Sequence, residues 1–440
     1  MSYKLTAQQQ EGQNKIFEWL DDEDKKFFLL SGYAGTGKTF LCADIVKKRQ
    51  SLIGTICVVA PTHKAKDVIQ SAFESLDVNA QFMTVHKLLG IRPELTPDGD
   101  EVFVRDNKVR CTANDYDLII IDECSMISQN LWNWILIECD NKVLFLGDPA
   151  QLPPVNEEMA MPFKTIEEND RVLLTDVVRY DSGIAELALK VRQSLEHPKL
   201  VGLLDVSGYF DNAPEVITLP RSEFDEEIKK EAQLYPMELK QCEPFKVMAW
   251  TNKCVDDYNK ILRLAKYGIN AKEYEPGEIV ICRKPYLEND SIIFPTATEL
   301  QILAVFKIPQ LMCFEGLPSY RLVVTNGEGK MEVETLSNLG ATQYWKKLEE
   351  VKHSALRDSD EENRKGKWFR FFKLKYHFIS LRPTFASTIH TMQGSGVDKA
   401  FVVLSDIERN EKIKEKNQLL YTAITRARKQ VIVLQRWQYS

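Results

Sequence analysis

The sequence lacks long hydrophobic runs and a recognisable leader. Across its 440 residues, no unbroken apolar stretch is longer than about five residues, whereas a membrane-spanning helix needs roughly 20. The N-terminus, MSYKLTAQQQEG, has neither a basic start nor an apolar core, so we expect no secretory signal. These absences predict a protein without a membrane partner, in the cytoplasm of a cell or of an infected host.

Paired metal-ligand spacings are also missing. The chain has nine cysteines, an odd number, and neither a CxxC nor an HxxxH pair occurs. A disulfide framework and a structural zinc site are therefore both disfavoured. We expect most of the thiols to be small core residues.

An overall basic surface is absent too, because the net charge is −7. Nucleic-acid contacts depend on local charge, however, and one stretch is strongly basic. Residues 364–375 hold six cations, no acid, and four aromatic side chains at 368, 369, 371 and 372. Either the cations meet phosphates while the aromatics stack on bases, or the aromatics form a core and the charges face solvent.

The composition, 44% hydrophobic and 28% charged, is that of a globular protein, and the length predicts about three domains. The first half alternates short apolar strands with longer helical segments, which indicates a parallel sheet covered on both faces. The expected strands are 27–31, 55–60, 118–121 and 143–146, and the expected first helix is 39–48. Turn residues and alternating apolar positions at 102–104 and 108–110 predict a hairpin insertion within 91–113.

The second half shows the same theme less regularly. We expect strands at 245–250, 400–404 and 430–434, and a helix at 253–267. Between them, short β runs at 278–282, 300–306 and 320–324 suggest a small antiparallel barrel. Residues 337–375 are charged and predicted to be partly helical.

A phosphate-binding loop is the strongest single motif. Residues 32–39, GYAGTGKT, match GxxxxGK[ST] between an expected strand and an expected helix. Glycines let backbone N–H groups close around phosphate oxygens at the start of a helix. We therefore expect Lys38 to reach the β and γ phosphates of ATP and Thr39 to bind Mg²⁺, with Gly35, Thr36 and Gly37 forming the loop.

Two further strand ends carry polar groups. The aliphatic strand 118–121 runs into Asp122 and Glu123, at the sheet edge where α/β proteins bind ligands. Asp122 is predicted to hold Mg²⁺ and Glu123 to activate the attacking water. Gln151, which follows the strand 143–146, either senses the γ-phosphate or belongs to a proline-rich turn.

These motifs resemble those of superfamily 1 helicases, in the expected order over nearly the whole chain. The supporting segments are APTHKA at 60–65, TVH at 84–86, LTDVVR at 174–179, STIHTMQG at 387–394 and YTAITRAR at 421–428. The compact length and the PTHKA and TVHKL wording are similar to group B, which includes the RecD-like and Dda-type enzymes. Residues 200–240 and 285–365 show no placeable similarity.

The resemblance implies a fold and further site residues. The fold is α/β, with two RecA-like domains, a β-hairpin insertion in the first and an SH3-like barrel insertion in the second. The resemblance implies that residues 1–90 with 114–175 form the first RecA-like domain, and that residues 176–275 with 378–440 form the second. Residues 91–113 are then the hairpin insertion. Residues 276–377 are the second insertion, which contains the barrel and a brace. Arginine fingers are expected at Arg179 and Arg426. Nucleotide contacts are expected at Gln9, favoured over Gln8 and Gln10, and at Gly394. DNA contacts are expected at Pro61, Thr62, His63, Thr84, His86, Phe103, Asn252, Thr388 and His390.

The function implied is an ATP- and Mg²⁺-dependent DNA helicase moving 5′→3′ on single-stranded DNA. Such an enzyme unwinds duplex tails in replication, recombination or repair, with a single-strand-binding protein as a candidate partner and a monomer as the expected state. Two alternatives stay open: a DNA-stimulated ATPase that displaces proteins, and a P-loop switch without nucleic acid. Phe103 is either a wedge that stacks on a base or a residue that packs the hairpin onto its domain.

Overall fold

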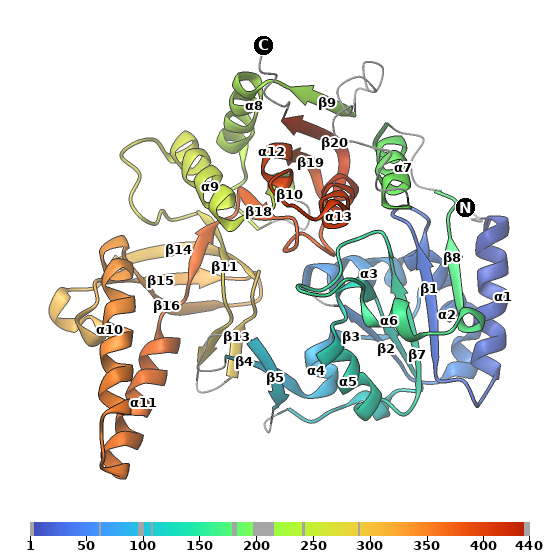
Figure 1. Ribbon diagram of the computed structural model, residues 1–440, viewed down its shortest axis with the longest axis horizontal. Coiled ribbons are helices and arrows are strands. Elements are labelled where there is room, and N and C mark those ends of the chain that lie inside the picture. Colours follow the sequence, from blue (N-terminus) through green and yellow to red (C-terminus); the bar gives the residue numbers. More distant parts are fainter. Residues whose placement is uncertain are drawn as a thin grey trace. The chain divides into compact units, whose positions relative to one another are not determined.

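The computed structural model describes residues 4–60, 63–95, 101–106, 109–177, 183–196, 215–239, 243–288 and 291–434. The chain divides into two compact units. Residues 1–220 and 392–440 form the first unit, and residues 221–391 form the second. Figure 1 labels most of the helices and strands of both.

A six-stranded parallel sheet is the centre of the first unit, in the order β3-β2-β6-β7-β1-β8. Its strands are β1 (Phe27–Gly32), β2 (Ile56–Ala60), β3 (Gln81–Thr84), β6 (Leu118–Ile121), β7 (Lys142–Gly147) and β8 (Arg171–Leu174). Its helices are α1 (Ala7–Asp21), α2 (Lys38–Ile53), α3 (His63–Ser75), α4 (Val85–Leu89), α5 (Gln129–Glu138) and α6 (Met161–Thr165). The predicted parallel sheet is confirmed.

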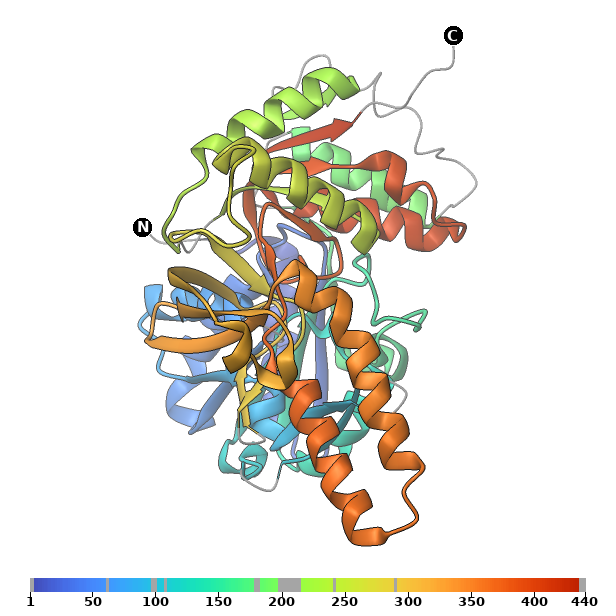
Figure 2. The same cartoon turned by 90° about the vertical axis from the view of Figure 1, so that its left-hand side faces the viewer.

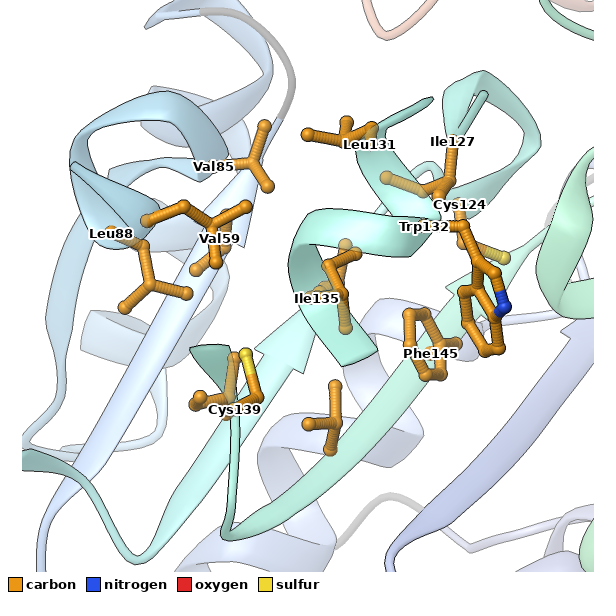
Figure 3. Close-up of a cluster of buried hydrophobic side chains, with 14 of the residues drawn as sticks. Val59, Val85, Leu88, Cys124, Ile127, Leu131, Trp132, Ile135, Cys139 and Phe145 are labelled. Atoms are coloured by element: carbon orange, nitrogen blue, oxygen red, sulfur yellow. The ribbon is translucent and has the colours of Figure 1, made fainter. Parts of the chain in front are cut away.

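Both faces of this sheet are buried, which explains the uninterrupted apolar strands. Phe28 and Leu30 point into a core formed with α1, α2 and α3. Leu29, between them, points into the opposite core with α4, α5 and α6, part of which Figure 3 shows. Burial of each large apolar side chain contributes about 1.5–3 kcal/mol to the stability of the fold. The two buried layers therefore keep the sheet rigid, including the edge at the carboxyl ends of its strands.

The hairpin insertion exists, but one of its predicted strands is wrong. β5 (Glu101–Arg105) pairs antiparallel with β4 (Ile91–Leu95), and Val109 and Arg110 are not in a strand. Pro93, which signalled a turn in the sequence, lies inside β4 opposite Phe103. Proline is tolerated there because a two-stranded ribbon has outer edges on which no N–H is needed.

The remaining elements of the first unit include a second parallel group, in which β20 pairs with both β19 and β9. The helices and strands in this remainder of the first unit are α7 (Gly183–Glu196), β9 (Val216–Leu219), β19 (Val397–Val402), α12 (Leu404–Ile407), α13 (Ile413–Thr425) and β20 (Ala427–Leu434). The expected strand 400–404 therefore ends two residues early, because Leu404 begins α12.

The second unit begins with α8 (Arg221–Leu234), β10 (Glu243–Ala249) and α9 (Asn252–Tyr267). β10 pairs in parallel with β18 (Ala386–Thr388). Asn259 of α9 brackets the backbone of Ala386: its Nδ2 donates to the carbonyl at 3.0 Å, and its Oδ1 accepts from the N–H at 2.9 Å. These bonds fix α9 against the strand that precedes residues 388–391.

An antiparallel sheet follows, in the order β16-β15-β14-β11-β17. Its strands are β11 (Ile279–Cys282), β14 (Glu299–Lys307), β15 (Ser319–Thr325), β16 (Lys330–Leu336) and β17 (Leu381–Pro383), beside the ribbon of β12 (Tyr286–Glu288) and β13 (Ser291–Phe294). The Ile379 N–H donates to the Glu334 carbonyl at 2.8 Å. The segment before β17 thus returns to β16, as closure of a barrel requires.

Two long helices complete the second unit. α10 (Asn338–Leu356) and α11 (Glu361–His377) lie side by side, as Figures 1 and 2 both show. Leu348, Val351, Phe371 and Leu374 are buried between them. The predicted helical character of 337–375 is confirmed. In the described part of the chain, no helix is long and apolar enough to cross a membrane.

Candidate active site

The phosphate-binding loop joins β1 to α2. Gly35 and Gly37 have φ of +82° and +77°, in the left-handed region that other residues rarely adopt. A Cβ on Gly37 would also stand 2.8 Å from Nε2 of Gln9. The loop therefore requires its glycines, and it leads into the N-terminus of α2, where backbone N–H groups favour an anion.

Of the three N-terminal glutamines, only Gln9 contacts this loop within the described structure. Its Nε2 donates to the Thr36 carbonyl at 3.0 Å, and its side chain is buried. Gln8 instead binds Thr175 at 2.8 Å, and the Gln10 amide reaches only residues of its own helix. The spacing preference for Gln9 agrees with this placement.

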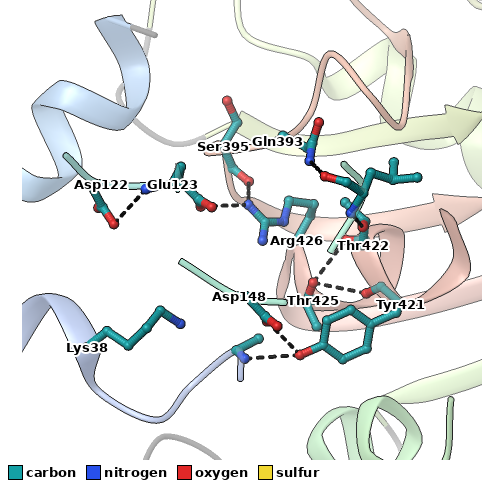
Figure 4. A network of polar contacts seen from close by, with 12 residues as sticks. Lys38, Asp122, Glu123, Asp148, Gln393, Ser395, Tyr421, Thr422, Thr425 and Arg426 are labelled. Carbon is teal, nitrogen blue, oxygen red and sulfur yellow. Dashed lines mark hydrogen bonds and ion pairs between the residues drawn. The ribbon is translucent and has the colours of Figure 1, made fainter. Parts of the chain in front are cut away.

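Lys38 lies over the loop that precedes it. Its Nζ donates to the carbonyls of Gly32 at 2.7 Å and Tyr33 at 3.1 Å. These carbonyls hold the ammonium at the centre of the loop, on the side of Asp122 and Asp148 (Figure 4).

Asp122 and Glu123 follow β6 directly. The Glu123 N–H donates to Oδ1 of Asp122 at 2.9 Å, and Glu123 has a left-handed φ of +53°. Burial, together with the neighbouring Glu123 charge, raises the pKa of Asp122 to about 7. Two crowded carboxylates at a strand end favour a nearby cation, which suits a magnesium ion.

Arg426, at the end of α13, meets this pair of acids. Its Nη1 lies 3.6 Å from Oε1 of Glu123 and donates to the Ser395 carbonyl at 3.5 Å. The side chain is only 8% exposed, and its Nε has no hydrogen-bond partner among the described residues. A buried guanidinium with an unused donor is suited to an anionic ligand.

A tyrosine connects the phosphate loop to the end of β7. The Tyr421 hydroxyl accepts from the Ala34 N–H at 3.1 Å and donates to Oδ2 of Asp148 at 2.8 Å (Figure 4). Burial raises the pKa of Asp148, although the Ala150 N–H also binds its carboxylate. One side chain of α13 thus holds two nucleotide-facing loops.

The loop after Asp148 has further contacts with the same region. The Leu152 N–H donates to the Thr422 hydroxyl at 3.3 Å, and the Leu152 carbonyl accepts from Gln393 at 2.8 Å. Gln418 donates to the Gln151 carbonyl at 3.1 Å, while Oε1 of Gln151 is buried without a partner in the described residues. The Gln151 side-chain oxygen is therefore available for a ligand.

Two family models match the chain. Residues 8–212 match the AAA domain, and residues 383–434 match the UvrD-like helicase C-terminal domain. The first match covers the phosphate loop and the Asp122–Glu123 strand end. The second covers Gln393, Tyr421 and Arg426.

Two relatives and one solved structure show similarity. An uncharacterised protein of Acanthamoeba polyphaga mimivirus, R530, is 30% identical over 59% of this chain and 56% of its own. The ATP-dependent DNA helicase dda of Enterobacteria phage T4 is 26% identical over 92% of this chain and 94% of its own. The chain is thus similar to an ATP-dependent DNA helicase over nearly its whole length. It spans little more than half the length of the mimivirus protein. The Pif1 helicase of Candida albicans is 15% identical, with 98% and 95% coverage and a TM-score of 0.45.

The structure brings together Gln9, Lys38, Asp122, Glu123 and Arg426 in the first unit. Gly394, with φ of +71°, belongs to the same unit, two residues before Gly396. Three of the predicted site residues, Arg179, Pro61 and Thr62, lie outside the described residues. Their roles stay predictions.

The other residues expected to contact DNA occupy helix starts and strand ends. His63 begins α3, and Thr84 caps α4 by accepting from the Lys87 N–H at 3.4 Å. In the second unit, Asn252 begins α9, while Thr388 ends β18 and shares a hydrogen bond with Thr391 at 2.7 Å. His390 follows two residues later, in the turn after β18.

Phe103 of the hairpin lies against His86 of α4. Their ring centres are 4.8 Å apart, and Phe103 packs against the core that includes α4 and α5. Burial lowers the pKa of His86 to about 4, so the ring is neutral at pH 7. Packing of Phe103 is thus observed, and the DNA contacts of both residues stay predictions.

We expect Phe103→Ala to lower stability by about 1–3 kcal/mol, because it removes a partly buried ring from the core and from His86. Urea unfolding of the variant measures this loss. Phe306→Ala is a matched control, because Phe306 is 56% exposed. Unchanged stability with reduced duplex unwinding would instead support the wedge role.

Sequence reasoning missed Asp148 and Tyr421 as site residues. Asp148 follows a buried strand as Asp122 does, and this position is a signal for a site residue. In the sequence analysis, the site role after this strand is assigned to Gln151 and not to Asp148. Tyr421 is the first residue of the YTAITRAR segment, but an aromatic in an amphipathic helix ordinarily belongs to a core, so no site role was predicted for it. Arg192 was also missed: its guanidinium lies 3.6 Å from the ring centre of Tyr33.

Proposed function

We propose that this protein is an ATP-dependent DNA helicase that translocates 5′→3′ on single-stranded DNA and unwinds duplex DNA. The observation that carries the proposal is the Arg426–Glu123 pair, which joins the UvrD-like segment to the acidic strand end of the AAA segment. An arginine at that position can neutralise the charge that develops on a γ-phosphate.

The residues of the site fit a magnesium-bound nucleotide. Thr39 in the first turn of α2 and Asp122 are the side chains that would hold Mg²⁺. When bound, the ion would supply positive charge to the phosphates. Lys38 would exchange its hydrogen bonds with the loop carbonyls for contacts with those phosphates. Gln9, which is hydrogen-bonded to the loop, would contact the adenine.

Hydrolysis requires a proton acceptor and a stabilised transition state. Glu123 accepts a proton from the attacking water, for which a carboxylate is suited. Arg426 exchanges its Glu123 contact for the γ-phosphate oxygens, with Arg179 as a second finger. Gln151 and Tyr421 link the state of the phosphates to the loop after β7.

For domain organisation, we propose residues 1–90 with 114–175 as one RecA-like domain and 176–275 with 378–440 as the other. The hairpin at 91–113 is an insertion in the first. Residues 276–377 are an insertion in the second, with an SH3-like barrel and a helical brace; the Ile379–Glu334 bond supports the barrel.

DNA is proposed to contact His63, Thr84, Asn252, Thr388 and His390, mostly through its backbone. Such contacts are sequence-independent and sensitive to salt. Single-stranded DNA and duplex-tail junctions are the proposed ligands. We also propose a monomer that works with a single-strand-binding protein in the cytoplasm of a bacterial or phage-infected cell.

The proposal is tested by steady-state ATPase with and without oligo-dT, followed by unwinding of duplexes with a 5′ or a 3′ tail. We expect stimulation by DNA and separation of the 5′-tailed duplex. Separation of only the 3′-tailed duplex would contradict the direction. Stimulated hydrolysis that displaces a bound protein but separates neither duplex would favour a protein-displacing ATPase.

A further inference from the structure

The basic aromatic run 364–375 is divided by the structure into paired and unpaired cations. Arg370 forms a bidentate pair with Glu315, Lys367 binds Asp358 at 2.6 Å, and Lys365 lies 3.0 Å from Glu361. Phe371 and Leu374 are buried between α10 and α11. Three of the six cations of this run are therefore paired with acids, and its buried apolar residues pack α11 against α10.

Lys375 differs from its neighbours because the charges beside it are also positive. Burial first, and then the nearby Lys284 and Lys352, lower the pKa of Lys375. Among the described residues, none of these three lysines forms an ion pair. Like charges gathered in this way cost free energy unless an anion lies against them.

The cationic group continues toward the start of α9. Arg283, next to Lys284 in sequence, lies 3.2 Å from Asp256. Arg382 donates to Asn252 at 3.3 Å, and its Nε is buried without a partner in the described part of the chain. Burial and the neighbouring Arg283 lower the pKa of Arg382. Residues 382, 283, 284, 375 and 352 thus form a basic track, with Asp256 as the one carboxylate bound to it by an ion pair among the described residues.

Exposed aromatic rings lie along the same track. Trp345 is 61% exposed, and the Lys284 ammonium is 5.7 Å from its ring centre. Phe372 is 41% exposed and stacks on Tyr376, with 6.4 Å between centres and 8° between planes. Rings open to solvent beside unpaired lysines can stack on nucleobases while the lysines meet phosphates.

We propose that the basic track binds single-stranded DNA and extends the strand path from Asn252 onto the α10–α11 hairpin. This inference rests on the proposed function, because Asn252 is the predicted DNA contact at which the track begins. The exposed rings favour a nucleic acid over an acidic protein segment, since stacking on bases uses their faces. Figure 1 labels α9, β11, α10 and α11 of the second unit; residues 283 and 284 directly follow β11, residue 382 lies in β17, and residues 352 and 375 lie in α10 and α11.

The test compares the full chain with the triple variant Lys284→Gln/Lys352→Gln/Lys375→Gln. Binding of oligo-dT is measured against salt, with an oligonucleotide of about 30 residues, longer than the ~16 nucleotides of the larger single-strand sites. The plot of log K against log salt has a negative slope, and loss of three phosphate contacts reduces the magnitude of that slope by about 2. We expect affinity near physiological salt to fall about tenfold or more.

Two further variants make the result specific. Trp345→Ala is expected to weaken binding about 5- to 100-fold, with little change in the salt slope, because it removes stacking and no charge. The control Lys229→Gln/Lys230→Gln/Lys260→Gln neutralises three exposed lysines of α8 and α9 away from the track and should bind as the unmodified chain does. All substituted side chains are at least partly exposed, so thermal unfolding should confirm intact folding.

Each outcome decides between the possibilities. If the unmodified chain shows DNA-stimulated ATPase but the triple variant keeps its affinity and slope, the track is not a DNA site and the proposed function stands. If poly-glutamate competes as well as oligo-dT and Trp345→Ala changes neither, the surface takes an acidic protein and the inference is overturned. If the unmodified chain neither binds oligo-dT nor is stimulated by it, the proposed function itself fails.

Discussion

Lys38→Ala is expected to reduce ATP turnover by about 10³-fold or more while the fold stays intact. Among the described residues, the ammonium donates hydrogen bonds to two loop carbonyls and belongs to neither core of the sheet, so its removal should leave both cores unchanged. In the reaction it is predicted to bind the β- and γ-phosphates, and losses of this size follow when one such charged group is removed. The measurement is steady-state ATPase at saturating oligo-dT, with thermal unfolding to confirm folding.

Lys47→Ala is the matched control for this variant. Lys47 lies on the same helix α2, is exposed, and donates to the Leu76 carbonyl on the surface. It should hydrolyse ATP as the unmodified chain does. Substantial DNA-stimulated ATP hydrolysis by Lys38→Ala would contradict the assignment of residues 32–39 as the phosphate-binding loop, whatever the control shows.

Arg426→Ala is expected to lower kcat by about 10³- to 10⁵-fold, with a smaller change in nucleotide affinity. This loss equals about 4–7 kcal/mol of barrier at 1.36 kcal/mol per factor of ten. The charge that the guanidinium stabilises grows between ground state and transition state, so kcat falls more than binding does. Because Arg426 lies 3.6 Å from Glu123, the variant also removes the cation beside Glu123, which is the predicted base.

Single-turnover hydrolysis and nucleotide binding measured separately distinguish these effects. Arg428→Ala is the control, because Arg428 is exposed and only two residues away. Arg179→Ala should behave as Arg426→Ala does if both act as fingers. Normal turnover in both arginine variants would mean that neither one stabilises the transferred phosphate.

The sequence by itself determined the features that depend on residues close together in the chain. The phosphate loop is an eight-residue pattern between a strand and a helix. The apolar runs that precede Asp122 and Asp148 predicted parallel strands buried on both faces, and the sheet is built in that way. Backbone conformation, strand burial and helix starts are governed by near neighbours, so periodicity and glycine positions were sufficient.

Tertiary structure decided which distant groups meet. The Tyr421 hydroxyl and the Ala34 N–H are 387 positions apart, and Arg426 reaches Glu123 over 303 positions. The contact of Gln9 with Thr36, the pairing of β5 with β4, and the burial of His86 against Phe103 also depend on packing. Lys284 comes from the bend after β11, Lys352 from α10 and Lys375 from α11, and their charges looked ordinary in sequence. Local patterns set the conformation of each segment, but side-chain burial and long-range pairing are properties of the assembled core, and they determine where charge is left unpaired.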